Sequence, residues 1–113
     1  MTLKESRREA VRSFKERKPS VGIYSVRCLS TSSAWVGMSN NLEATQNRIW
    51  FSLRNRQHQE KSLQEEWNRC GEGAFEYAII HRVAGDVHPL ELPDLLKALK
   101  SDYVVRLNAR PLL

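Results

Sequence analysis

Apolar side chains recur at the spacing of an amphipathic helix in four stretches of the chain. In such a stretch, positions three and four residues apart face the core, and charged residues cover the other side. Leu63 and Trp67 show this spacing in the third stretch, and Gly71 follows it as a stop signal. The pattern predicts helices over 3–18, from 42 to between 54 and 57, over 60–69, and from 92 to about 107. The expected buried positions of the second and last helices are Leu42, Ile49, Trp50 and Leu53, and Leu95, Leu96, Leu99, Tyr103 and Leu107.

Three further segments are rich in β-branched and aromatic residues, which is typical of strands. They cover residues 21–29, 34–38 and 74–83. A polar tract of serine and threonine over residues 30–33 joins the first two into a hairpin. The order α-β-β-α-α-β-α predicts an α+β fold, with a small three-stranded antiparallel or mixed sheet flanked by helices and an extra N-terminal helix.

The composition suits one soluble domain, since the chain has 113 residues, of which 41% are apolar and 27% charged. It has no apolar run of about 18 residues, and its charged N-terminus lacks the apolar stretch of a signal peptide. We therefore expect a cytoplasmic protein with no membrane segment. Residues 1–19 form the predicted basic helix, and residues 20–110 form the predicted globular domain.

The net charge is +5, and the isoelectric point is about 9.6. Residues 1–18 hold seven basic and three acidic groups, a local net charge of +4. A basic surface attracts the phosphates of nucleic acid by releasing counterions, and such binding weakens steeply with salt. Many small basic proteins bind no nucleic acid, however, so charge alone favours this partner only weakly.

Cys28 and Cys70 lie far apart in the sequence and form neither a CxxC pair nor a zinc-type cluster with the three histidines. We expect two free thiols that pack as small hydrophobic side chains. Trp50 and Trp67, at helical spacing, are expected in the core rather than as platforms for stacked bases. No GxSxG, P-loop or HExxH motif is present.

An ordered set of short motifs runs through residues 20–108. Gly22-Ile23-Tyr24 stands on the first predicted strand, and Trp35-Val36-Gly37 stands on the second, with ten residues between Tyr24 and Trp35. An arginine-bearing helix follows, then His58, then an aromatic-bearing helix and a strand that begins near Phe75. In order, spacing and element type, this pattern resembles the GIY-YIG endonuclease family.

The resemblance implies a three-stranded sheet flanked by helices and cleavage of DNA phosphodiester bonds with one divalent metal ion, usually magnesium. It implies that Tyr24 helps to activate the attacking water, that Trp35 forms a wall of the site, and that Arg48 stabilises the phosphate. His58 would donate to a phosphate or to the leaving oxygen. These residue types suit the reaction, because in-line attack builds negative charge that cations and hydrogen-bond donors offset.

The chain departs from the family pattern at four points, the first of which is Trp35 in place of the usual tyrosine of the second motif. The family's helix arginine corresponds to Thr45, and Arg48 lies one helical turn later. The family's metal-binding glutamate corresponds to Lys100, which cannot ligate magnesium, and a nearby carboxylate could replace it only in a shifted register. Asn108 comes too early to match the family's late asparagine. The carboxylates close to Lys100 in sequence are Glu91, Asp94 and Asp102.

Three functions therefore stay open. The first is a metal-dependent nuclease with full or weakened catalysis. The second is a non-catalytic module that keeps the GIY-YIG fold and binds nucleic acid, most plausibly DNA, through its basic groups. The third is a small interaction domain whose charge has no such role. The expected nucleic-acid contacts, besides the basic N-terminal helix, are Arg48, Arg54, Arg56 and Lys61.

Overall fold

The computed structural model describes residues 20–84 and 86–112, so the predicted N-terminal helix lies outside the described residues. None of the helices in this part of the chain is long and apolar enough to cross a membrane. The elements, in chain order, are β1 (Gly22–Cys28), β2 (Ala34–Ser39), α2 (Leu42–Arg54), α3 (Lys61–Cys70), the short 3₁₀ turn η1 (Glu72–Ala74), β3 (Phe75–Arg82), α4 (Leu92–Arg106) and β4 (Arg110–Pro111).

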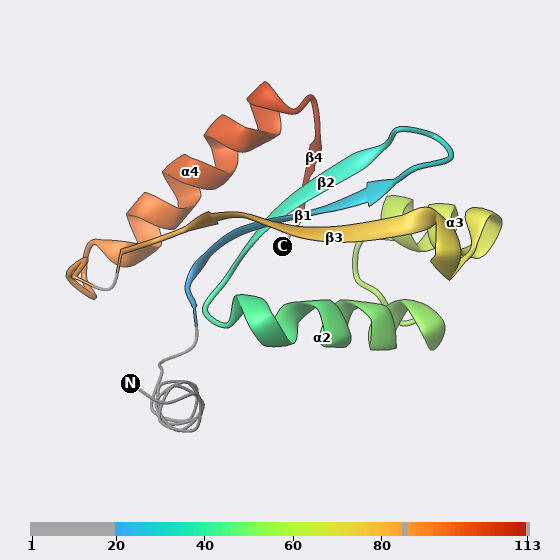
Figure 1. Ribbon diagram of the computed structural model, residues 1–113, viewed down its shortest axis with the longest axis horizontal. Coiled ribbons are helices and arrows are strands. Elements are labelled where there is room, and N and C mark those ends of the chain that lie inside the picture. Colours follow the sequence, from blue (N-terminus) through green and yellow to red (C-terminus); the bar gives the residue numbers. More distant parts are fainter. Residues whose placement is uncertain (1–19, 85, 113) are drawn as a thin grey trace, which may run out of the picture.

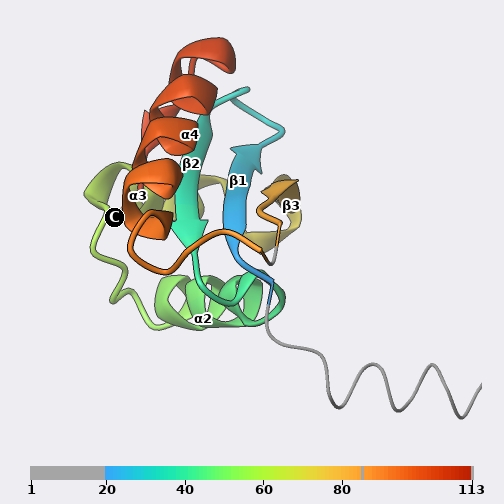
Figure 2. The same cartoon turned by 90° about the vertical axis from the view of Figure 1, so that its left-hand side faces the viewer.

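The strands form one mixed sheet in the order β3-β1-β2-β4. β1 pairs antiparallel with β2 and β3, whereas β4 pairs parallel with β2. Helix α4 lies on one face of the sheet, and α2 and α3 lie on the other (Figures 1 and 2). The predicted α+β class and flanking helices are confirmed, but the sheet has a fourth strand that the sequence pattern did not indicate.

Local signals set the helix boundaries close to where the sequence predicted them. The side chain of Asn41 caps α2 by accepting a hydrogen bond from the Ala44 N–H at 3.2 Å. Gly71 ends α3 with a positive φ of 85°, a backbone conformation that favours glycine. Pro93, in the first turn of α4, lacks the N–H that would have no partner there.

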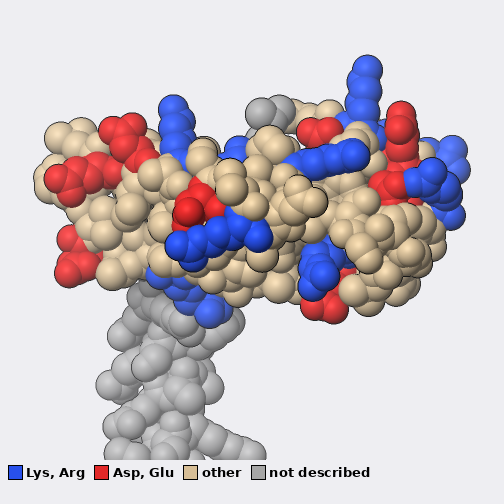
Figure 3. All heavy atoms as spheres, turned by 90° about the horizontal axis from the view of Figure 1, so that it is seen from above, with Lys and Arg blue, Asp and Glu red and all other residues tan. Residues whose placement is uncertain are grey.

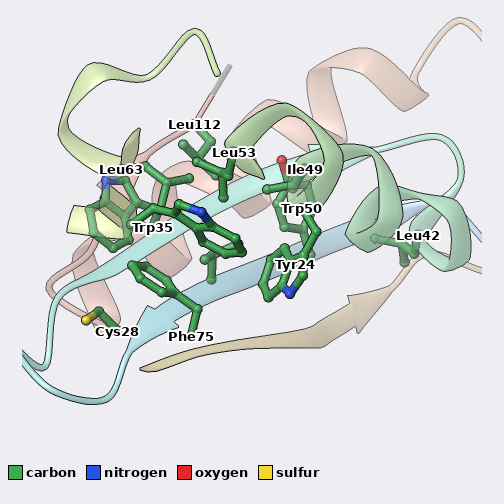
Figure 4. Packing of buried hydrophobic residues seen from close by; sticks show 12 residues of the cluster. Tyr24, Cys28, Trp35, Leu42, Ile49, Trp50, Leu53, Leu63, Phe75 and Leu112 are labelled. Carbon is green, nitrogen blue, oxygen red and sulfur yellow. The ribbon is translucent and has the colours of Figure 1, made fainter. Parts of the chain in front are cut away.

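Alternation along the strands divides the core between the two faces. Tyr24 and Val26 pack towards α2 and α3, whereas Ile23 and Val36 belong to the cluster that packs against α4. Trp50 and Trp67 are buried together in the larger cluster, with their rings edge to face, which confirms their expected core position. Ten residues of this cluster are labelled in Figure 4.

The predicted apolar side of the last helix is only partly correct. Leu96 is buried, and Leu99 and Tyr103 pack against its cluster. Leu107, in contrast, is 46% exposed, because α4 ends at Arg106 and the chain turns there towards β4. On the α4 side, basic and acidic side chains are interspersed rather than separated (Figure 3).

Candidate active site

Tyr24 lies in the middle of β1, on the face of the sheet that carries α2 and α3. Its side chain is 4% exposed, and its ring stacks on that of Tyr77 with 5.5 Å between the ring centroids. Burial, with a smaller contribution from Tyr77, raises the pKa of Tyr24 to about 12, against an opposing effect of the Arg48 guanidinium. The phenol therefore keeps its proton at neutral pH.

Gly37, the antiparallel partner of Tyr24 on β2, makes room for the phenol. A β-carbon at position 37 would lie 2.4 Å from the Tyr24 hydroxyl oxygen and 2.5 Å from the ring carbon that carries it. Side chains do not approach one another so closely, so only glycine leaves the ring in place. Gly22 has a similar role beside β3, where a β-carbon would lie 1.9 Å from the carbonyl oxygen of His81.

Arg48 reaches back one helical turn to Thr45, the position that corresponds to the family's helix arginine. Its Nη2 lies 3.4 Å from Thr45 Oγ1. Thr45 Oγ1 gives its only proton to the Asn41 carbonyl at 2.7 Å, so its lone pairs accept from Arg48 and from the Ser39 hydroxyl at 2.6 Å. Arg48 is exposed and forms no ion pair with any residue in 20–84 or 86–112.

His58 lies in the connection between α2 and α3 and is partly buried. Its Nδ1 accepts the backbone N–H of Glu60 at 3.0 Å. In the neutral imidazole Nε2 then carries the proton and is a hydrogen-bond donor. Burial lowers the pKa of His58, although the hydrogen bond and the charge of Glu60 oppose this effect. The ring is thus held in one tautomer by the start of α3.

Tyr24, Arg48 and His58 line one cavity of about 550 Å³, a size typical of ligand-binding clefts. Strand β1, helix α2 and the α2–α3 connection each supply one of these side chains, and the end of β2 completes the wall. Much of the remaining wall is polar. It includes Ser39, Asn40, Asn41, Ser52, Gln57 and Gln59.

Comparisons with known proteins match the fold rather than the sequence. No family model and no curated protein matches the chain. The solved catalytic domain of the homing endonuclease I-TevI aligns with a TM-score of 0.69 and 21% identity, over 82% of this chain and 98% of that one. A point mutant of the catalytic domain of the intron endonuclease I-TevI aligns with a TM-score of 0.67 and 22% identity, over 79% and 84%.

The chain has the fold of a GIY-YIG endonuclease domain. This likeness confirms the fold that the motif resemblance implied.

Trp35, which the GIY-YIG resemblance placed in a wall of the site, does not line the cavity. It is fully buried in the core, and its indole N–H donates to Ser62 Oγ at 3.0 Å. Trp35 faces the same side of the sheet as Tyr24 but pairs with Val26, farther along β1 towards α3. Its position indicates a packing residue that anchors α3 to the sheet, contrary to the expectation from the motif.

The remaining basic residues expected at a nucleic-acid surface differ in whether a carboxylate already binds their side chain. Arg54 is bound to Glu72 by two hydrogen bonds of 2.6 and 2.9 Å, so its guanidinium already has a carboxylate partner. Arg56 and Lys61 are exposed and flank residues 57–60, which line the cavity. Of these basic residues, Arg48 is the one whose side chain lines the cavity. Arg56 and Lys61 adjoin the cavity-lining residues 57–60 in sequence.

The carboxylate at the cavity is not on the last helix, where the GIY-YIG resemblance implied a metal-binding glutamate. Helix α4 contributes no carboxylate to the cavity within the described residues, and its Lys97 lines a neighbouring hollow of about 370 Å³. Asp102 of α4 is paired with Arg106 at 3.0 Å. Glu60 is the acidic residue that lines the cavity, and magnesium in proteins often takes one carboxylate together with water and phosphate oxygens. A magnesium ion at this cavity would therefore have Glu60, rather than a residue of α4, as its protein ligand.

Glu60 was missed as a site residue: the sequence pattern placed it inside the predicted helix over 60–69, whereas it precedes α3 and caps it. Its Oε1 indeed accepts from the Ser62 backbone N–H at 3.4 Å and from the Ser62 hydroxyl at 2.8 Å. The signal that was available is its place two residues after His58. Because His58 and Glu60 are two residues apart in the short α2–α3 connection, both line the same cavity.

Proposed function

We propose that this chain is a GIY-YIG-type nuclease that cleaves phosphodiester bonds of DNA with the help of a divalent cation. One observation carries the proposal: Tyr24, Arg48 and His58 come from three separate segments and line one polar cavity. The similar solved structures are catalytic domains of an endonuclease, and this supports DNA as the substrate.

Arg48 and His58 supply the hydrogen-bond donors that the reaction needs. In-line attack builds negative charge on the non-bridging oxygens of the phosphate. The Arg48 guanidinium is oriented by Thr45 and can pair with two of these oxygens at once. His58 offers Nε2–H, because its Nδ1 is occupied by the Glu60 N–H, and donates to a phosphate oxygen or to the leaving oxygen.

Tyr24 orients the attacking water as a neutral phenol. With a pKa raised to about 12, its hydroxyl is not a phenolate at neutral pH. It accepts a hydrogen bond from the water and holds the water oxygen in line with the phosphorus. Gly37 beneath the ring and Tyr77 stacked on it keep the phenol in one position.

Glu60 is the residue that would hold the magnesium ion. The two hydrogen bonds from Ser62 both reach Oε1 and fix the carboxylate, which leaves Oε2 as the ligand atom. When bound, the ion supplies positive charge that stabilises the phosphate oxygens during the reaction.

The same features also support a second candidate, a module that binds nucleic acid without cleaving it. Within the described residues Glu60 is the single carboxylate at the cavity, and α4 brings a lysine to the neighbouring hollow. A site with a single carboxylate beside an arginine can hold a phosphate but holds a metal ion weakly.

A plasmid-nicking assay separates the two candidates. The protein is incubated with supercoiled plasmid and magnesium or manganese, with EDTA added to a parallel sample. Nicking that depends on the metal, vanishes in Tyr24→Phe and persists in Tyr103→Phe supports the nuclease. Tyr103 is a suitable control, because its hydroxyl lies 3.2 Å from His81 Nδ1 on the α4 side of the sheet.

The opposite result is equally clear. Salt-sensitive retention of DNA on a gel without nicking supports the binding module. Absence of both signals refutes both candidates and leaves a small interaction domain.

A further inference from the structure

Two thiols and a carboxylate meet at the edge of the core, away from the cavity. The ligand atoms of Cys28, Glu66 and Cys70 all lie within 4.8 Å of one another. Cys28 is the last residue of β1, and Glu66 and Cys70 are one turn apart on α3. Figure 4 shows Cys28 at the margin of the labelled cluster, with its sulfur directed away from Phe75.

The three atoms are close enough for one tetrahedral metal ion. Zinc binds cysteine sulfur at about 2.3 Å and carboxylate oxygen at about 2.0–2.2 Å, so its ligands stand roughly 3.5–3.8 Å apart. The three ligand atoms, at most 4.8 Å apart, are already close to this separation. Small side-chain rotations therefore bring all three atoms to bonding distance.

Neighbouring residues orient this cluster in the way that metal ligands are usually supported. Thr31 Oγ1 donates to Glu66 Oε2 at 2.9 Å, and the Arg69 guanidinium pairs with Glu66 Oε1. A carboxylate oxygen that accepts one hydrogen bond keeps a lone pair for a metal ion. The positive charge of Arg69 balances the excess negative charge of two thiolates and one carboxylate around a dication.

We propose that Cys28, Cys70 and Glu66 bind a thiophilic divalent cation of the zinc type. Binding releases the two thiol protons to solvent and forms two metal–sulfur bonds and one metal–oxygen bond. A fourth position stays open for water on the side of Cys70 and Glu66, which are only partly buried, whereas Cys28 is fully buried. Thiolate ligands select zinc over magnesium, so this site is chemically separate from the cavity. The ion would join the end of β1 to α3.

Metal uptake by the reduced, metal-free, full-length protein tests the proposal. Zinc is titrated against a chromophoric chelator, and cobalt(II) is used as a spectroscopic substitute. We expect one zinc ion per chain, a thiolate-to-cobalt charge-transfer band, and a rise of at least about 5 °C in the unfolding midpoint.

Substitutions identify the ligands. Cys70→Ser and Glu66→Gln are expected to weaken zinc binding by more than the roughly 10- to 100-fold that loss of a supporting residue causes. Thr31→Val should fall within that smaller range. Glu65→Gln, an exposed neighbour on the same helix, should bind zinc like the parent protein. These positions are partly buried or exposed, so the variants should fold even if the buried Cys28 tolerates no change.

Three outcomes would overturn the proposal. One is no zinc uptake by the reduced protein. Another is uptake that is unchanged in Cys70→Ser, which would assign the ion to other residues. The third is oxidation of the metal-free protein to a Cys28–Cys70 disulfide with no zinc binding under reducing conditions. None of these results depends on DNA cleavage.

Discussion

The phenol of Tyr24 lies across Gly37, its partner on the neighbouring strand, with no space for a β-carbon between them. The two residues belong to different motifs of the sequence, Gly22-Ile23-Tyr24 and Trp35-Val36-Gly37. Their contact joins the two motifs across the β1–β2 pair. The glycine of the second motif determines where the hydroxyl of the first motif stands, and therefore shapes the cavity.

Replacing Gly37 with alanine should displace the Tyr24 ring, because the new methyl group would stand 2.4 Å from its hydroxyl oxygen. We expect a loss of about 1–3 kcal/mol in the free energy of unfolding, measured by urea denaturation. Gly73→Ala is the matched control, since nothing lies within 4 Å of a β-carbon there. In a Tyr24→Ala background the Gly37→Ala effect should shrink, and equal effects in both backgrounds would contradict the contact.

Removal of the Arg48 guanidinium should affect cleavage far more than stability. Arg48→Ala is expected to lower the nicking rate roughly 100- to 1,000-fold, as loss of a preorganised charge-stabilising donor does. Arg48→Lys should recover only part of the rate, because an ammonium makes a point contact rather than a paired one. Arg54→Gln is the control, because Glu72 already holds that guanidinium. An equal loss of rate in both arginine variants would argue against the assignment to Arg48.

The stability of the domain should depend on the charge of His58. Burial lowers the pKa of His58, so between that lowered value and the ordinary value of about 6.5 the unfolded chain binds a proton that the folded chain does not. The free energy of unfolding should therefore be highest above about pH 6.5 and fall as the pH decreases through that window. Denaturation across this pH range should show a smaller fall in His58→Gln. An identical pH dependence in both proteins would rule out His58 as the source.

Most of the net positive charge lies in residues 1–18, which carry a net of +4 out of a total of +5. If these residues contact nucleic acid, neutralising Arg7, Arg8 and Arg12 with glutamine should lower the slope of log affinity against log salt by about 0.9 for each lost phosphate contact. Gel-retention titrations over a range of salt concentrations measure this slope. Arg106→Gln is the control, since Arg106 pairs with Asp102 at 3.0 Å. An unchanged slope in the triple variant would exclude these three arginines from phosphate contact.

The hydrophobic pattern was sufficient for the long elements. α2, α3 and α4 begin within a residue of the predicted starts. Asn41 caps α2, Glu60 caps α3, and α4 begins next to Pro93. β4 could not be predicted from periodicity, since a two-residue strand shows no alternation. Its signal is tertiary: the backbone N–H of Leu112 donates to the Val36 carbonyl at 2.7 Å, and the Leu112 side chain is 2% exposed.

Tyr24 and His58, which the motif resemblance implied as site residues, line one cavity, and their roles in a reaction stay predictions. Arg48 also lines the cavity, because its length lets it reach back to Thr45. The resemblance placed Trp35 in a wall of the site, but Trp35 pairs with Val26 rather than with Tyr24 and does not line the cavity. The meeting of Cys28 with Cys70 was equally invisible in the sequence, because it depends on how α3 packs against the end of β1.

The parallel pairing of β4 with β2 has a consequence for synthesis on the ribosome. Arg110 pairs with Trp35, so β2 keeps an unpaired edge until everything from α2 to α4 has been translated and has left the exit tunnel. Antiparallel β1 and β2 are neighbours in sequence and can form their hairpin early, whereas closure of the other edge must wait for a contact between distant parts of the chain. A nascent chain stalled between these two events would present a bare strand edge, the kind of surface that chaperones bind and that aggregates recruit.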